Sequence, residues 1–452
     1  EAFRAFALAI KRSPRGAPEP KRPVYGEVHI LALVGEAPAK PMPFIGEQER
    51  LARQIRALVR KGDNAGALRA LRSEQAQRAM SARQQDALAA HVAMGYFVDG
   101  DDKSAYGIAS AAANRSGRSV GQAHWVTHFE ATAVAPGATS WTAAAGAFWA
   151  GRIHLALRQV GKARAWLEKA ARHDHTFYGQ LALHALEAGS PFNWRAPEAT
   201  SADIARLRGL KAGRRALALL QIREYWRADQ ELQPLVDDAD QATLRSILAI
   251  AQSYSAPRAS IQAAHRLNRR GGGYSAPGHF PIPPWNAPKS QPVDRALLYA
   301  FMRQQSQFNP RAASPAGARG LMQVLPSTAN YILGQDRYVK AYRDGLFDPE
   351  QSVAVGARYI RYLLRKKQVG NGLFRLAIAY NAGIGNLIRW QKTIKDNDDP
   401  LLFIEALPSR ETRVFVERVL ANYWIYRDRL GQRAPSREDV AQGRWPIYKR
   451  QE

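Results

Sequence analysis

The chain of 452 residues is long enough for two to four domains with a large buried core. It contains no cysteine, which excludes disulfides, thiol catalysis and thiolate metal sites, and it has no run of 18 apolar residues that would span a membrane. Its net charge of +26 favours polyanionic partners, but no binding motif accompanies the charge, so we expect no nucleic-acid partner. The short basic runs Arg269-Arg270 and Lys366-Lys367 are interpreted as solvated faces.

Residues 1–45 are rich in proline and weakly patterned, so we expect an extended arm that wraps the next domain or is partly mobile. Glu1–Arg12 is too short and too polar for a signal peptide, and the chain does not begin with Met. These features predict a processed or trimmed chain.

Residues 46–270 show successive helical patterns rich in Ala, Leu, Arg and Gln. Short helices that cannot bury their apolar faces alone indicate a stacked solenoid, although no regular repeat period is evident. The clearest predicted helices, with a break expected at Gly161 between the first two, are 143–157, 162–172, 213–227, 229–236, 241–253 and 258–270.

Two histidines in this part, His124 and His128, have a spacing that can hold a metal on a helix. The residue between them that a zinc protease would need as glutamate is Trp125, so we expect packing or surface histidines and no metal or other cofactor.

Residues 271–292 contain three successive glycines followed by six prolines, a density that predicts a linker without helix or central strand. The following segment, residues 293–452, is predicted to be a separate helical domain that ends in a basic tail from residue 431. Its main predicted helices are 296–305, 352–366, 373–381 and 414–429.

In the first predicted helix of this domain, the apolar stripe ends in a side-chain amide. Asp294 can cap the helix, and Leu298, Met302 and Gln305 then fall on one face at i, i+4 and i+7. A polar group at the buried end of such a stripe needs a hydrogen-bond partner or a functional role. For an isolated glutamine, a satisfied core residue would be the natural interpretation.

Gln305 is not isolated, because four motifs follow one another in a fixed order. They are Arg-Gln-Gln-Ser-Gln-Phe-Asn-Pro at 303–310, Ser-Pro-Ala-Gly-Ala at 314–318, Gly-Leu-Met-Gln at 320–323 and Ala-Tyr-Asn-Ala-Gly at 379–383. This arrangement resembles the catalytic domain of the soluble lytic transglycosylases, which have a goose-type lysozyme fold and cut the glycan strands of peptidoglycan. Residues 405–416 resemble the family's Glu-Thr-Arg-x-Tyr-Val signature, with Phe415 in place of the usual tyrosine.

The helical half resembles the same family. The segments 148–152, 161–164 and 176–182, the last reading Thr-Phe-Tyr-Gly-Gln-Leu-Ala, are similar to the α-superhelix that precedes the catalytic domain there. The resemblance implies an all-α chain in which a superhelix at 46–270 is joined through 271–292 to a lysozyme-like domain at 293–452. It also implies a periplasmic protein of a Gram-negative bacterium whose signal peptide has been removed.

The resemblance assigns roles to particular residues. In the family a single glutamate protonates the leaving oxygen and then accepts a proton from the C6 hydroxyl of the sugar, which gives a 1,6-anhydro product at the MurNAc–GlcNAc bond. Gln305 stands at that glutamate's position. The substrate-binding residues implied by the motifs are Ser314, Met322, Gln323, Tyr380, Asn381 and Glu411.

Gln305 departs from the family in the residue that matters most, because an amide cannot donate a proton as an acid and take one back. The chain as given is therefore expected to bind glycan and barely cut it. An engineered Glu-to-Gln substitution and a natural non-cutting relative both fit this observation. A glutamate at the same position would have a raised pKa beside the apolar Leu298, Phe301 and Met302.

Three other functions were compared with this interpretation. A muramidase-type hydrolase would use water as the nucleophile, and most glycosidases use a second carboxylate, for which we find no candidate near Gln305 in the sequence. A non-catalytic scaffold would bind peptidoglycan and other cell-wall proteins through the helical half. A basic nucleic-acid-binding solenoid would leave the ordered motifs unexplained.

Overall fold

The computed structural model describes residue 44, residues 46–81, several positions between 84 and 108, and residues 140–156, 159–338, 340–394, 396 and 398–451. Within these ranges the regular structure is helical, apart from two isolated bridges that pair Arg319 with Ala313 and Val324. This confirms the predicted all-α class for the described part of the chain. None of these helices combines the length and apolarity that crossing a bilayer requires. Apart from Phe44, the predicted arm lies outside the described residues, as do His124 and His128.

The chain divides into two compact units. The first unit comprises the described parts of Glu1–Gly189 together with Ala377–Glu417 and Pro435–Ile447. The second unit comprises Ser190–Leu376, Arg418–Ala434 and Tyr448–Glu452. The predicted domain boundaries at residues 45, 270 and 292 stay predictions.

Helices of the first unit come from both ends of the chain. Among them, α9 lies against α10 and α11, and α11 lies against α25. Within the described residues, the helices that lie wholly in this unit are α3 (Glu47–Arg60), α4 (Asn64–Arg72), α5 (Glu74–Ala79), α9 (Ser140–Ala156), α10 (Val160–Ala171), α11 (Phe177–Ala185), α22 (Ile384–Thr393), α23 (Pro400–Glu405) and α25 (Pro435–Ala441).

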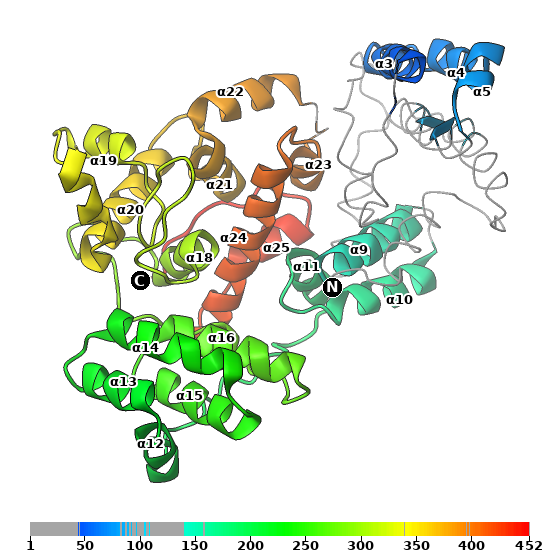
Figure 1. The fold of residues 1–452 in the computed structure, drawn as a ribbon. Coiled ribbons are helices and arrows are strands. Elements are labelled where there is room, and N and C mark those ends of the chain that lie inside the picture. Colours follow the sequence, from blue (N-terminus) through cyan, green and yellow to red (C-terminus); the bar gives the residue numbers. More distant parts are fainter. Residues whose placement is uncertain are drawn as a thin grey trace. The chain divides into compact units, whose positions relative to one another are not determined.

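The second unit begins with a run of short helices that share one apolar core. In Figure 1 this run, α12–α16, is drawn in green. The helices that lie wholly in this unit are α12 (Ser201–Arg208), α13 (Lys211–Gln221), α14 (Tyr225–Asp238), α15 (Gln241–Ser253), α16 (Pro257–Arg269), α17 (Ala276–His279), α18 (Arg295–Ser306), α19 (Pro326–Leu333), the 3-10 helix η1 (Lys340–Phe347) and α20 (Pro349–Leu364). Two further helices, α21 (Leu373–Ala382) and α24 (Arg410–Arg429), each contain residues of both units.

Local capping explains where several of these helices begin. Thr200 and Asp203 form a reciprocal capping box at the start of α12, and Asp240 accepts a hydrogen bond from the Thr243 backbone N–H at the start of α15. Leu244 and Ile247 of α15 are then fully buried in the shared core. The predicted helix 241–253 coincides with α15 for this reason.

Three predictions about helix boundaries are wrong. Gly161 does not break a helix, because α10 already begins at Val160 and includes it. The predicted helix 213–227 is two helices: α13 ends at Gln221, and Arg223 has a left-handed φ of 61° before α14 begins. The segment 271–292 does contain a helical turn, α17, because Pro277 occupies one of its first two positions, where proline leaves no hydrogen bond unmade.

The start of α18 is fixed by buried charges. The Asp294 carboxylate accepts a hydrogen bond from the Ala296 backbone N–H, which confirms the predicted cap, and it forms an ion pair of 2.8 Å with Arg427 of α24. Tyr448 supports the same point, since its hydroxyl accepts from the Asp294 backbone N–H. Because Asp294 and Arg427 are at most 1% exposed, removing either one would leave an uncompensated charge inside the unit.

Candidate active site

Gln305 lies in the last turn of α18, at the end of the predicted apolar stripe. Leu298 and Met302 are completely buried, while Gln305 is partly exposed. The helix stops directly afterwards because Gln307 and Phe308 have left-handed φ values of 49° and 61°. Phe308 is fully buried, and this burial holds the strained ending in place. The position therefore combines a fixed backbone with a side chain that solvent and ligands can reach.

The loop after α18 folds back on the helix end. The Ser306 hydroxyl contacts the carbonyl oxygens of Met302 and Leu321, at 3.1 Å and 2.9 Å. Ser314 closes the tip of this loop, since its Oγ accepts a hydrogen bond of 3.0 Å from the Ala318 backbone N–H. Gly317 lies within this turn with a φ of 87°. Ser314 is thus used in building the loop.

Gly320 and Met322 join the loop to α20. A Cβ atom at Gly320 would lie 1.9 Å from the Leu346 carbonyl oxygen, so only glycine fits there. The Met322 side chain is fully buried against Gly356, where an added Cβ would lie 2.4 Å from the Met322 Cγ. The Ser352 hydroxyl also accepts from the Met322 backbone N–H at 3.3 Å. Met322 therefore has a packing role in the described structure.

Gln323 holds the two ends of the loop together. Its side-chain amide donates to the carbonyl oxygens of Ala312 and Gly320, at 2.8 Å and 2.9 Å. Gln323 itself has a left-handed φ of 48°, and its side chain is half-buried. With its amide nitrogen engaged by the backbone, Gln323 retains its Oε1 as an acceptor.

A second group of predicted site residues lies in the first unit, on the parts of α21 and α24 that belong to it. Asn381 donates to the exposed Glu411 carboxylate at 3.3 Å and accepts from the Thr412 hydroxyl at 2.7 Å. The Ser409 hydroxyl accepts from the Thr412 backbone N–H and so caps α24. Asn381 and Glu411 are therefore oriented by each other and by the helix cap.

Tyr380 packs against the residue that departs from the family signature. Its ring stacks on Phe415, with the centroids 6.4 Å apart and an interplanar angle of 13°. Tyr380 is 8% exposed and Phe415 is 4% exposed. A tyrosine in place of Phe415 would bring a hydroxyl group into this buried stack.

The first turns of α24 rest on a buried carboxyl group that we did not assign from the sequence. Glu405 accepts a hydrogen bond from the Tyr178 hydroxyl of α11 and lies 3.8 Å from the Arg413 guanidinium, with both charged side chains 3% exposed. Burial raises the pKa of Glu405 to about 7, against the opposing effects of Arg413 and Tyr178. The same burial raises the pKa of Tyr178 well above its usual value.

Arg413 is held by Glu405 in two ways. Its guanidinium lies beside the Glu405 carboxylate, and the Glu405 backbone carbonyl also accepts from Arg413 at 3.2 Å. Tyr178 and Glu405 both lie in segments that resemble the family, yet they are 227 residues apart. No sequence pattern signals a contact at that separation.

The predicted site residues thus fall into two sets. The α18 loop set contains Gln305, Ser314, Met322 and Gln323. These residues lie in the second unit, where hydrogen bonds of Ser306 and Gly320 join the segments that carry them. The α24 cap set contains Tyr380, Asn381 and Glu411. These residues lie in the first unit, where Thr412 contacts Asn381 and Phe415 contacts Tyr380. In the α18 loop set the polar side chains form hydrogen bonds with backbone atoms, whereas in the α24 cap set they form hydrogen bonds with other side chains.

Comparison with known proteins identifies the segment that holds most of these residues. The family model described as the transglycosylase SLT domain matches residues 285–403, which include six of the seven predicted site positions, all but Glu411. Residues 285–403 are therefore similar to a transglycosylase SLT domain. The match contains all of the α18 loop set, together with Tyr380 and Asn381.

Curated relatives agree with this identification. A soluble lytic murein transglycosylase of Salmonella typhimurium is 34% identical over 147 residues, or 32% of this chain. The protein of the same description from Escherichia coli is 34% identical over 142 residues, or 31% of this chain. The chain spans only 22% of the length of either relative in these alignments.

Solved structures extend the similarity in fold to most of the chain. The 70-kDa soluble lytic transglycosylase of Escherichia coli aligns with 91% of this chain and 67% of its own, with a TM-score of 0.59 and 20% identity. An inactive mutant of the lytic transglycosylase Slt from Pseudomonas aeruginosa aligns with 89% of this chain and 65% of its own, with a TM-score of 0.57 and 22% identity. Their fold combines a helical superhelix with a lysozyme-like domain, which confirms the predicted fold class.

Proposed function

We propose that this protein is a lytic transglycosylase of peptidoglycan and that Gln305 occupies the position of its catalytic acid and base. The observation that carries the proposal is the SLT domain match at 285–403, within which Gln305 lies in the last turn of α18 on a fixed backbone. The relatives found by sequence are described as murein transglycosylases, which supports a glycan strand of peptidoglycan as the substrate.

Each predicted residue has a role in this proposal. A glutamate at position 305 protonates the glycosidic oxygen and then takes the proton of the C6 hydroxyl, which closes the 1,6-anhydro ring. The Oε1 of Gln323 accepts from the sugar, while Met322 and Ser314 keep the loop in shape for it. Asn381 and Glu411 present an amide and a carboxylate to the substrate, and Tyr380 supports Asn381 from the adjacent position. No cofactor takes part in this scheme.

With glutamine at position 305, the proton transfers have no donor or acceptor, so the chain as given binds glycan without turning it over. One of the similar solved structures is an inactive mutant in which glutamine replaces a glutamate, which supports this interpretation of Gln305. The superhelix at 46–270 engages longer glycan or other cell-wall proteins, and 293–452 performs the chemistry. We further propose a periplasmic location in a Gram-negative bacterium, in keeping with the bacterial relatives.

The direct test is to restore the carboxyl group. Gln305→Glu should raise the turnover of purified peptidoglycan by about 10²–10⁴-fold, the usual worth of a general acid and base, with little change in binding. Gln304→Glu is the matched control, because it adds the same charge one residue away and should leave turnover at the starting level. A folded Gln305→Glu protein that remains inert would remove position 305 from the mechanism.

A further inference from the structure

Alternating cationic and aromatic side chains connect helix α14 to the hairpin that follows α18. The Arg311 guanidinium lies 4.9 Å from the centre of the Trp226 ring and 5.7 Å from the centre of the Phe347 ring. The Arg319 guanidinium lies 5.5 Å from the centre of the same Phe347 ring. A guanidinium within about 6 Å of a ring centre is attracted by the π electrons of the ring. We call these four side chains the Trp226 row.

The hairpin 311–319 begins and ends with the arginines of the Trp226 row. Directly after Arg311, the Ala312 carbonyl oxygen accepts from the Gln323 side-chain amide at 2.8 Å and from the Gly320 backbone N–H at 2.9 Å. A displacement of Arg311 would therefore move the carbonyl oxygen that orients the Gln323 amide.

Trp226 lies in the first turn of α14, and this helix is held in place without the hairpin. Ala228 and Leu232 of α14 are buried in the core that α12–α16 share. The Asp229 carboxylate accepts from the Ala259 backbone N–H at 2.8 Å, which joins α14 to the first turn of α16. Trp226 is half-buried on this support. The indole is therefore a fixed surface against which the hairpin can rest.

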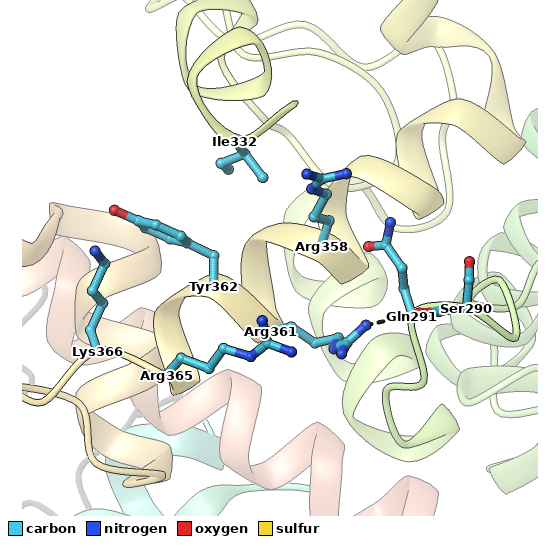
Figure 2. A pocket seen from close by; sticks show the side chains of 8 residues that line it. All are labelled: Ser290, Gln291, Ile332, Arg358, Arg361, Tyr362, Arg365 and Lys366. Carbon is cyan, nitrogen blue, oxygen red and sulfur yellow. Dashed lines mark hydrogen bonds between the residues drawn. The ribbon is translucent and has the colours of Figure 1, made fainter. Parts of the chain in front are cut away.

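Phe347 also has a support of its own. It is the last residue of η1, and Arg319 forms an ion pair of 3.2 Å with Asp344 of the same helix. The following helix, α20, is anchored where Arg361 donates to the Ser290 carbonyl oxygen at 3.0 Å (Figure 2). Both rings of the Trp226 row thus belong to helices that are fixed by other contacts.

We propose that Trp226 is a positioning residue for substrate binding, which acts through Arg311 to hold the hairpin where Gln323 meets the sugar. The proposal rests on the proposed function for the role of Gln323. Arg311 is exposed and forms no ion pair within the described part of the chain, so the aromatic rings direct its guanidinium. Without the indole, Arg311 keeps one ring instead of two, and the hairpin occupies a wider range of positions. Binding groups must be held within about 0.5 Å of their working positions, so this change weakens binding.

The first test is the binding of purified, soluble peptidoglycan glycan strands to the chain as given, because Gln305 leaves the ligand intact. Trp226→Ala should weaken binding about threefold or more, the worth of one exposed contact between a cation and a ring, with an unchanged circular dichroism spectrum. Trp226→Phe keeps a ring beside Arg311 and should restore most of the affinity. Amide hydrogen exchange in residues 311–323 should rise by a similar factor in Trp226→Ala and not in Trp226→Phe.

Arg311→Gln tests whether Trp226 acts through Arg311. This variant of an exposed residue should weaken binding at least as much as Trp226→Ala, and the double variant should bind like Arg311→Gln alone. Losses that add up in the double variant would overturn the proposal, because they would show that the two side chains act independently.

The matched control is Tyr254→Ala, which removes a 37% exposed aromatic side chain at the end of α15. It should bind glycan strands like the unchanged chain. An equal loss in Tyr254→Ala would overturn the proposal, as would unchanged binding in Trp226→Ala.

Kinetics in the Gln305→Glu background separate positioning from folding. A positioning role raises the KM for glycan strands and leaves kcat nearly unchanged in Trp226→Ala, because a binding contact is lost. A purely structural role lowers kcat through the folded fraction and leaves KM unchanged, and this result would overturn the proposal.

The binding and exchange measurements need no catalysis, so the two proposals fail separately. If Gln305→Glu remains inert while Trp226→Ala loosens the hairpin and weakens binding, the role of Trp226 stands and the catalytic proposal falls. If Gln305→Glu cuts glycan and adding Trp226→Ala changes neither KM nor binding, the catalytic proposal stands and the role of Trp226 falls.

Discussion

The α18 loop set and the α24 cap set are built in different ways, although both are predicted to serve one substrate. In the α18 loop set, Gln323 and Ser314 bond to backbone atoms, and Gly320 fits where no side chain could. In the α24 cap set, Asn381 is held by the side chains of Glu411 and Thr412. Substitutions in the α18 loop set should therefore change folding, whereas those in the α24 cap set should change ligand binding more than folding.

The largest effect should come from the tightest backbone contact. Gly320→Ala combines a left-handed φ of 75° with a Cβ placed 1.9 Å from the Leu346 oxygen, so we expect a loss of about 3–5 kcal/mol in unfolding free energy. Gly317→Ala is the control, since its φ of 87° gives strain but its nearest neighbour, the Arg319 side chain, is 3.9 Å away. It should cost about 1 kcal/mol. Denaturant unfolding measures both, and similar costs would mean that the loop can move aside.

The support of the α24 cap set should depend on pH through Glu405. The folded protein has the higher pKa, about 7, against an ordinary value of 4.5. The folded state therefore binds the proton more tightly, and the stabilising contribution is complete below about pH 4.5 and is lost as the pH rises through 7. The loss amounts to about 3 kcal/mol at most.

A variant isolates this contribution from other titrating groups. Glu405→Gln cannot ionise, so the melting temperature of the variant should fall less than that of the unchanged chain between pH 4.5 and 8. Asp238→Asn, at an exposed position of α14, should follow the unchanged chain. Buried Asp229, whose pKa burial also raises to about 7, remains present in all three proteins and cancels in the comparison. Parallel pH profiles for Glu405→Gln and the unchanged chain would contradict this account.

The smallest expected effects distinguish the side-chain amides of Gln323 and Asn381, which carry the same hydrogen-bonding groups. Gln323→Ala removes two hydrogen bonds to carbonyl oxygens and should cost about 1–2 kcal/mol of stability. Asn381→Ala should cost under about 1 kcal/mol, because Thr412 keeps its contact with Ser409 and Glu411 is exposed to water. Both variants should bind glycan more weakly. A larger stability loss for Asn381→Ala than for Gln323→Ala would reverse the distinction between the two sets.

Local patterns predicted well those features that depend on neighbours in the sequence. The Asp294 cap, the bounds of α15 and the burial of Leu298 and Met302 follow from capping chemistry and helical periodicity. The wrong predictions of helix boundaries also have local causes, which the periodicity of apolar residues does not reveal. The left-handed Arg223 splits one apolar run into two helices, and Pro277 begins a helical turn inside a proline-rich segment.

The site was harder to predict, because its partners are distant. The motifs drew attention to Gln323 and Asn381, but only the fold shows that one bonds to backbone and the other to side chains. Tyr178 and Glu405 belong to two separate family-like segments of the sequence. Their contact across 227 residues depends on how α11 packs near α23. The periodicity and motifs of a single sequence do not indicate which distant residues form such pairs.

The central claim is that position 305 belongs to a transglycosylase, and the products of the Gln305→Glu variant test it most directly. A tethered C6 hydroxyl has a large effective concentration over water, and it needs no second carboxylate to activate it. Mass spectrometry of a peptidoglycan digest should therefore show 1,6-anhydro ends, each lighter by one water than the hydrolysed product. A digest in which reducing ends predominate would contradict the claim and would require a water-activating carboxylate elsewhere in the site.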